Sequence, residues 1–322
     1  MTPTVPNCAV IFKAYGWDGF VERQARRLAE ASGAMDFYIS IDETGGLAGP
    51  INFERVIRFT CADLDAAGLA MRSPVGGVLW WNPDYAHYQF LEQCPNYDYY
   101  LFVEYDCVAQ CSLEQFVSEA SSRGADLVAF PMTSVFDEWH WTPYQRNVYS
   151  PDEIGRALLC VSLYSSRALN MLYQRRLAMS SDPSVQEWPN SELFVPTEVL
   201  RAGMTWFPLQ DFGDVSRYVW FPPKLEEDLP SVNSGAFFHP VLDRRRYLSS
   251  MLDNRGSLQP GELRRALSRF RRQEYAHLIW RSARKAAMKA IRHKLRKRLI
   301  GRHVHFFSSR PPVEPPGWRS AI

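Results

Sequence analysis

Apolar residues in the first 130 positions follow two different periods. Short, mostly apolar runs between turn residues predict buried strands, and apolar residues that recur at helical spacing predict helices. The predicted strands cover residues 8–12, 35–41, 55–59, 97–103 and 125–130, and the predicted helices cover 19–31, 82–94 and 112–120. This alternation predicts an α/β fold with a mostly parallel central sheet flanked by helices.

The pattern changes after Pro131. Residues 132–156 are rich in Pro, Asn, Ser and aromatic residues, a composition typical of a long functional loop. Regular periodicity then returns, with strands expected at 158–163 and 205–208 and helices at 166–176 and 192–202. The helix at 82–94 is expected to begin at Asn82-Pro83, since Asn suits the cap and Pro the first helical position.

The most apolar and aromatic run, residues 97–103, ends at two acidic residues, Glu104 and Asp106. A run of this kind predicts a strand in the middle of the sheet. Ligands of such sheets bind beyond the carboxyl ends of the strands, and hard cations prefer oxygen ligands. The motif therefore predicts a Mg²⁺ or Mn²⁺ site, with two solvated turn carboxylates as the alternative.

The segment Tyr97-Asp-Tyr-Tyr-Leu-Phe-Val-Glu-Tyr-Asp106 resembles the strand and DxD-type motif of GT-A glycosyltransferases, with Glu in place of the first Asp. The resemblance implies a GT-A-like (Rossmann-like) catalytic domain over residues 1–245. It also implies a metal-dependent glycosyltransferase that moves a sugar from a UDP- or GDP-sugar to a glycan or lipid-linked acceptor. Asp106 would bind Mn²⁺ or Mg²⁺, and Glu104 would contact the nucleotide or share the metal.

The same resemblance gives a role to His239, which follows an apolar run that starts at Gly235. Many GT-A enzymes take a metal ligand from a histidine near the end of the domain. A neutral imidazole can join two carboxylates and a diphosphate around Mn²⁺. The alternative is a half-buried histidine whose ring bonds a backbone carbonyl.

The general base is expected among several acidic residues. Asn190 or Ser191 can cap a helix whose first turn holds Glu192, and a carboxylate there is also common for structural reasons. The segment resembles the Glu-x-x-x-x-Thr segment of some inverting GT-A enzymes, whose Glu deprotonates the acceptor. Glu192 is the first candidate and Glu198 the second. Asp137, with Glu138 beside it, is the third.

Resemblance to the family also points to the exits of the first two strands. Lys13 would meet phosphate, and Asp42 would bind a base edge or a ribose hydroxyl. Three neighbouring rings in the aromatic loop, Trp139, His140 and Trp141, would stack on an acceptor sugar. Each of these residues also fits a purely structural place in a loop.

The six cysteines, several of them in strand-like runs, fit buried thiols better than a disulfide framework. Cys107 and Cys111 also suggest a zinc site. No second pair follows at zinc-site spacing, so buried thiols are the preferred interpretation.

Charge divides the chain in two. Residues 261–322 carry a net charge of +14, which leaves −12 for residues 1–260 because the whole chain carries +2. An acidic body cannot attract polyanions by its overall charge, so it must meet any phosphate with a metal or a few donors. Nucleic acid is therefore not the expected partner of the body.

Residues 246–322 are expected to form a basic helical tail. Apolar residues spaced by fours from Ile279 to Leu299 predict one amphipathic helix between 261 and 300. Contact with an anionic membrane surface is the preferred interpretation. Binding of nucleic acid and packing onto the acidic body are the alternatives.

The chain shows neither a long uncharged apolar run nor a secretory signal, which predicts a cytoplasmic protein, peripheral at the inner membrane if the tail binds lipid. The expected setting is surface polysaccharide or glycolipid synthesis. The rival functions are a non-catalytic carbohydrate- or membrane-binding protein on the same fold and a metal-dependent nucleotidyltransferase.

Overall fold

The computed structural model of the 322-residue chain describes two compact units, Met1–Asp243 and Arg244–Ile322. The residues described are 6–74, 76–132, 137, 139, 141–230, 234–285 and 287–288. The sequence predicts a boundary after residue 245, close to this division.

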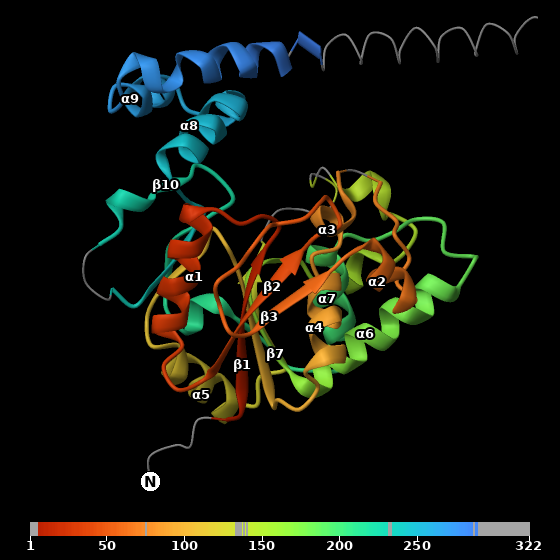
Figure 1. The fold of residues 1–322 in the computed structure, drawn as a ribbon. Coiled ribbons are helices and arrows are strands. Elements are labelled where there is room, and N and C mark those ends of the chain that lie inside the picture. The colour runs from red at the N-terminus through yellow and green to blue at the C-terminus, as the bar shows by residue number, and fades with distance from the viewer. Residues whose placement is uncertain are drawn as a thin grey trace, which may run out of the picture. The chain divides into compact units, whose positions relative to one another are not determined.

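A seven-stranded sheet forms the centre of the first unit, in the order β3-β2-β1-β4-β7-β6-β8 (Figure 1). Its strands are β1 (Cys8–Ala14), β2 (Asp36–Asp42), β3 (Val56–Phe59), β4 (Tyr99–Glu104), β6 (Leu127–Pro131), β7 (Ala157–Ser165) and β8 (Trp206–Pro208). β7 is antiparallel to both of its neighbours, whereas the other paired strands are parallel. The predicted mostly parallel sheet is confirmed, and β4 lies at its middle.

Helices cover both faces of this sheet, as the strand sequences require. In β4, Tyr100 and Phe102 enter one apolar cluster, while Leu101 and Val103 enter the other, because successive side chains of a strand point to opposite faces. The helices against the first face are α2 (Cys61–Ala66), α4 (Tyr85–Gln93), α6 (Ser166–Ser181) and α7 (Ser191–Arg201), and those against the second are α1 (Gly19–Ala31) and α5 (Leu113–Ser122) (Figure 1). The predicted α/β fold with flanking helices is confirmed.

Two smaller sheets extend the unit beyond β4. β5 (Val108–Gln110) pairs with β11 (Ala236–His239), which pairs in turn with β9 (Asp214–Tyr218). β10 (Lys224–Leu225) pairs with β12 (Val241–Leu242). Because β5 follows Asp106 by one residue, its pairing with β11 brings the last part of the unit to the end of the central strand.

Some local predictions need correction. The helix expected to begin at Asn82-Pro83 is capped at Asp84 instead, and a short helix, α3 (Val78–Trp81), precedes it. The Asn82 side chain donates to the carbonyl of Val78 at 2.9 Å and so closes α3. A side chain committed to the preceding helix is not available as a cap for the next one.

The second unit also departs from prediction. In place of one helix from residue 261, its described part holds α8 (Arg244–Asp253), α9 (Glu262–Leu267) and a helical stretch over 272–285. Leu278 and Ser282 form the buried side of that stretch, whereas Ile279 and Ala283 are exposed. The Ser282 hydroxyl donates to the carbonyl of Leu252 at 3.2 Å. This contact explains why the helix buries Leu278 and Ser282 and not the predicted apolar face of Ile279 and Ala283. Ile291, Leu295 and Leu299 lie outside the described residues.

Every helix in the described ranges is too short or too polar to span a bilayer.

A fully buried ion pair joins three helices on the first face of the sheet. The Arg176 guanidinium in α6 donates to Asp84 at 2.7 Å and to the carbonyl of Pro189 at 3.1 Å, and both charged side chains are inaccessible to solvent. It lies 3.7 Å from the centre of the Phe194 ring in α7. The other oxygen of Asp84 accepts from Ser191 at the start of α7. This network fixes the first turn of α7.

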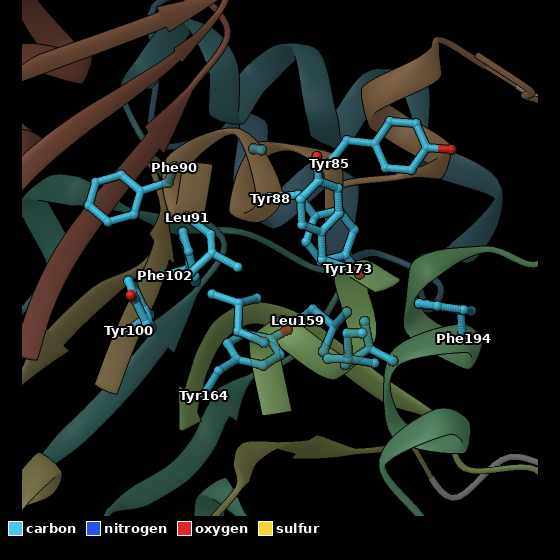
Figure 2. Close-up of a cluster of buried hydrophobic side chains, with 14 of the residues drawn as sticks. Tyr85, Tyr88, Phe90, Leu91, Tyr100, Phe102, Leu159, Tyr164, Tyr173 and Phe194 are labelled. Carbon is cyan, nitrogen blue, oxygen red and sulfur yellow. The ribbon is translucent and has the colours of Figure 1, made fainter. Parts of the chain in front are cut away.

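The aromatic residues around this network pack closely. Figure 2 shows Tyr88 beside Tyr173, whose rings stack with centroids 5.0 Å apart, and Phe194 on the neighbouring helix. Tyr88 donates to Asp84 at 3.0 Å. The buried carboxylate of Asp84 is therefore surrounded by donors, which offsets the cost of its desolvation.

Removing the Arg176 side chain tests this network. We expect Arg176→Ala to cost about 3–5 kcal/mol of unfolding free energy, because it leaves the Asp84 charge buried and unpaired. Urea denaturation followed by circular dichroism measures this loss. The control is Arg175→Ala, whose side chain is 60% exposed and pairs with Glu198, so it should cost about 1 kcal/mol or less. Equal losses in the two variants would contradict the interpretation.

Candidate active site

A cavity of about 870 Å³ lies at the carboxyl ends of the parallel strands of the first unit. Lys13 enters it from the end of β1, Asp42 from the end of β2, and Glu104 and Asp106 from the end of β4. Glu192, in the first turn of α7, completes the polar lining. Residues far apart in the sequence meet here because the carboxyl ends of parallel strands share one edge of a sheet.

Three of the predicted metal ligands lie together. A carboxylate oxygen of Glu104, a carboxylate oxygen of Asp106 and a ring nitrogen of His239 all lie within 4.8 Å of one another. The Nε2 atom of His239 is 3.9 Å from Oδ1 of Asp106. The backbone holds the two segments in register, since the amide of Val241 donates to the carbonyl of Asp106 at 2.7 Å.

The His239 ring is oriented by the backbone behind it. Its Nδ1 atom lies 2.8 Å from the carbonyl oxygen of Val219, so this partner assigns the proton of a neutral ring to Nδ1. In that neutral form, which metal binding requires, Nε2 carries the lone pair and faces Asp106. A hydrogen bond from the other ring nitrogen to a carbonyl is the usual support for a metal-binding histidine. The backbone carbonyl partner expected of a structural histidine is thus present, but it bonds Nδ1 and leaves Nε2 as the atom that could bind a metal.

The charges of this cluster depend on one another. Burial raises the pKa of Asp106 to about 6, and neighbouring Glu104 adds to the effect while His239 opposes it. Burial by itself lowers the pKa of His239, but Cys160, Asp106 and Glu104 outweigh it and raise that pKa to about 10. In the absence of a metal the His239 ring therefore keeps its proton at neutral pH and compensates part of the carboxylate charge, and a cation that binds there would displace this proton.

The donor set fits a divalent cation. Oδ1 of Asp106 is buried and has no hydrogen-bond partner among the described residues, although it faces His239. Two carboxylates suit Mg²⁺ and Mn²⁺, and an imidazole adds a preference for a transition metal. The three side chains could therefore hold Mn²⁺ or Mg²⁺.

Lys13 lies beside the cluster and is held on two sides. Its Nζ atom is 3.3 Å from Oε1 of Glu104 and 3.1 Å from Nε2 of His87 in α4. Burial and the Lys13 charge hold the pKa of His87 well below its usual value, so the ring is neutral and Nε2 accepts the hydrogen bond. The His87 ring stacks on Phe102 of β4, with centroids 3.9 Å apart.

Sequence reasoning missed His87. A single histidine in an apolar helix carries no signal of its own, and its partner lies 74 positions earlier in the chain. His87 aims the ammonium group of Lys13 at the cavity edge.

Glu192 is positioned at the start of α7. The side chain of Asn190 accepts from the Glu192 amide at 2.8 Å and donates to the carbonyl of Trp81 at 3.0 Å, so it ties the helix start to α3. Burial raises the pKa of Glu192 to about 7, with a further contribution from the charge of Glu104. A carboxylate of this kind can exchange a proton near neutral pH.

The other two predicted bases lie elsewhere. Glu198 accepts from the Tyr149 hydroxyl at 2.9 Å and pairs with Arg175, away from the residues described as lining the cavity. Six residues along an α-helix correspond to a rotation of about 240°, so Glu192 and Glu198 point in different directions. Asp137 is 73% exposed, pairs with Arg146 and is not part of the described lining. Glu138 lies outside the described residues.

Asp42 and the aromatic residues occupy other parts of the wall. Oδ1 of Asp42 accepts from the Thr44 amide at 2.8 Å and thereby shapes the glycine turn that follows β2. Trp141 lines the cavity and packs edge-on against Trp80, with centroids 5.0 Å apart. Trp80 is 55% exposed and was missed from the sequence.

Trp139 does not join this wall. It is buried within the apolar cluster on the first face of the sheet, so its predicted part in sugar stacking needs correction. His140 lies outside the described residues. Spacing alone could not separate Trp139 from Trp141, because the loop that carries them has no regular period.

Comparisons with known proteins add little. No family model matches this sequence, and no curated protein matches it. The chain is similar to a solved structure described as the crystal structure of a glycosyltransferase involved in the glycosylation of the major capsid of PBCV-1. The TM-score is 0.34 and the identity 11%, over 63% of this chain and 82% of that chain. A likeness this distant does not identify a reaction, which has to be inferred from the site itself.

Metal binding tests the cluster directly. We expect the protein to bind Mn²⁺, and Asp106→Ala and His239→Ala each to weaken binding at least about tenfold, since even loss of an outer partner costs about 10- to 100-fold. Electron paramagnetic resonance of free Mn²⁺ during a titration measures the affinity. Asp137→Asn is the matched control, because it removes an exposed carboxylate outside the described lining. An equal loss in the control would contradict the site.

Proposed function

We propose that residues 1–243 form a GT-A-like catalytic unit that transfers a sugar from a nucleotide diphosphate sugar to a glycan or lipid-linked acceptor. One observation carries the proposal. Glu104 and Asp106, which form a metal-ligating cluster with His239, line the same cavity as Glu192. A group that can hold a metal and a group that can take a proton thus line one cavity.

The cavity suits a donor of this kind. Its volume of about 870 Å³ lies within the range of pockets that bind small molecules and cofactors, about 300–1,000 Å³. Asp42 would accept from the base or ribose, and Glu104 would lie on the nucleotide side. Lys13, fixed by His87, would place its ammonium group near a phosphate oxygen.

Departure of the nucleoside diphosphate is the step that requires positive charge. Mn²⁺ or Mg²⁺, held by Asp106, His239 and Glu104, would supply the Lewis acidity that stabilises this leaving group. His239 keeps its ligand nitrogen directed at Asp106 through its bond to Val219. Lys13 adds a second positive charge 3.3 Å from Glu104.

Glu192 would act on the acceptor. With a pKa of about 7, it would accept the proton of the attacking hydroxyl as the new glycosidic bond forms, which corresponds to an inverting reaction. Trp80 and Trp141 would present their faces to the acceptor sugar. The buried network around Arg176 would keep Glu192 in place during this step.

Separate substitutions of Glu192 and Glu198, which lie on one helix, test the assignment of the general base. We expect Glu192→Gln to lower kcat for Mn²⁺-dependent hydrolysis of UDP- or GDP-sugars by about 10²–10⁴-fold, since an amide cannot take the proton of the attacking water. The KM for the donor should stay close to the wild-type value. The measurement is release of the nucleoside diphosphate.

Glu198→Gln is the matched control and should keep wild-type hydrolysis, because Glu198 faces Tyr149 and Arg175. Equal losses in both variants would contradict the role of Glu192. Release of pyrophosphate from a nucleoside triphosphate, with sugar nucleotides left intact, would contradict the proposed reaction and favour a nucleotidyltransferase.

We also propose that the basic second unit contacts anionic lipid. Trp280 is 66% exposed and Ile279 is exposed beside it, and the Arg284 guanidinium lies over the Trp280 ring at 5.6 Å. Aromatic and aliphatic side chains among arginines are typical of helices that lie at a membrane interface.

Vesicle sedimentation tests this contact. The full chain should bind vesicles that contain phosphatidylserine and not vesicles of phosphatidylcholine alone, and salt should weaken binding because the attraction is partly electrostatic. Trp280→Ala should bind phosphatidylserine vesicles more weakly than the wild-type protein does at the same salt concentration. Equal binding to both kinds of vesicle would contradict the proposal.

A further inference from the structure

A second group of metal-ligating side chains lies directly beside the carboxylate cluster. The sulfur atoms of Cys107 and Cys160 and a ring nitrogen of His239 all lie within 4.8 Å of one another, and all three residues are buried. The thiol of Cys107 also lies 3.5 Å from the carbonyl oxygen of Cys160. The carboxylate cluster uses neither cysteine.

The topology of the sheet explains why these residues meet. Cys107 follows Asp106 at the end of β4, and Cys160 lies on β7, which is antiparallel to β4. The strand register pairs Val103 with Val161, so Cys160 lies one position further toward the cavity. The two cysteines are 53 residues apart, which is why sequence spacing pointed to Cys111 as the partner of Cys107 instead.

The chemistry of this group differs from that of the carboxylates. Two thiols and an imidazole suit zinc and other soft cations, whereas carboxylates suit Mg²⁺ and Mn²⁺. Each thiol gives its proton to solvent as its sulfur binds the cation. Zn²⁺ with two thiolates and a neutral imidazole then has no net charge, which favours a buried place.

Access to the group is through the cavity already described. Cys160 lines that cavity together with Glu104 and Asp106. A cation that enters it therefore meets both sets of ligands. His239 belongs to both sets, and its Nδ1 atom is already bonded to the carbonyl of Val219. Only one ring nitrogen remains, so the imidazole can serve one cation at a time.

We propose that Cys107, Cys160 and His239 form a soft-metal site that binds Zn²⁺ or Cd²⁺ and competes for His239 with the carboxylate site. When a soft cation binds at the thiols, it uses the His239 imidazole, which is then no longer available to a cation at the carboxylates. Binding at the thiol site thus weakens binding at Asp106 and Glu104 without occupying them. This inference does not depend on the reaction that the enzyme catalyses.

Cadmium is the probe, because thiolates bound to Cd²⁺ give a charge-transfer absorption in the ultraviolet that carboxylates do not give. We expect the full-length protein to show this band on titration with Cd²⁺. Cys160→Ala and Cys107→Ala should each weaken Cd²⁺ binding at least about tenfold, since a direct ligand is lost, and should keep Mn²⁺ binding. Asp106→Ala should show the reverse pattern.

Two further variants make the test specific. Cys111→Ala removes the cysteine that sequence spacing would have chosen, and it should leave both affinities unchanged. His239→Ala should weaken both. Thermal denaturation verifies that each variant is folded, and the two cysteine positions give independent tests if one variant does not fold.

The proposal is overturned if the wild-type protein gives no band, if Cys111→Ala loses it, or if either Cys107→Ala or Cys160→Ala, once shown to be folded, binds Cd²⁺ as tightly as the wild type. Undiminished Cd²⁺ affinity in His239→Ala would contradict the claim that His239 is a ligand of both sites. Since the band does not require turnover, failure of the proposed transferase reaction would leave this result intact.

Discussion

Burial of two carboxylates side by side at the tip of the central strand is the constraint on which the site depends. Glu104 and Asp106 repel each other there, and burial makes each charge more costly. Lys13 offsets part of the charge from the β1 side, and His239 faces the carboxylates from β11. A divalent cation between the acids and the imidazole would remove the remaining cost and would place positive charge where a diphosphate could use it.

The rest of the first unit holds this arrangement in place. β5 and β11 pair directly after Asp106 and so carry His239 to the strand end. On the opposite face, the buried pair of Arg176 and Asp84 fixes the start of α7 and with it Glu192. His87 positions Lys13 in the same way. His87 and the pair of Arg176 and Asp84 thus support the site without being part of the described cavity lining.

Parts of this site could be predicted from the sequence because they follow a local rule. Lys13, Asp42, Glu104 and Asp106 each come at the end of a strand that its apolar run reveals, and parallel strands bring such ends to one edge. Glu192 follows from the capping residues before it. The mostly parallel sheet itself was predictable from the alternation of strand and helix.

The remaining features depend on tertiary contacts. His87 reaches Lys13, and Cys160 reaches Cys107, only through the packing of α4 and β7 against β4. Neither contact leaves a pattern in the chain. Glu198 shares a helix with Glu192 yet turns toward Tyr149, a difference that its position in the sequence does not reveal. The start of α4 was misplaced because the Asn82 side chain closes α3 instead.

Anomalous diffraction from crystals grown with Mn²⁺ and UDP, or GDP, tests the central claim most directly. We predict a manganese peak in contact with Asp106 and Nε2 of His239, with diphosphate oxygens completing its coordination. A nucleotide bound in this cavity without manganese at these residues, or manganese bound elsewhere on the unit, would contradict it.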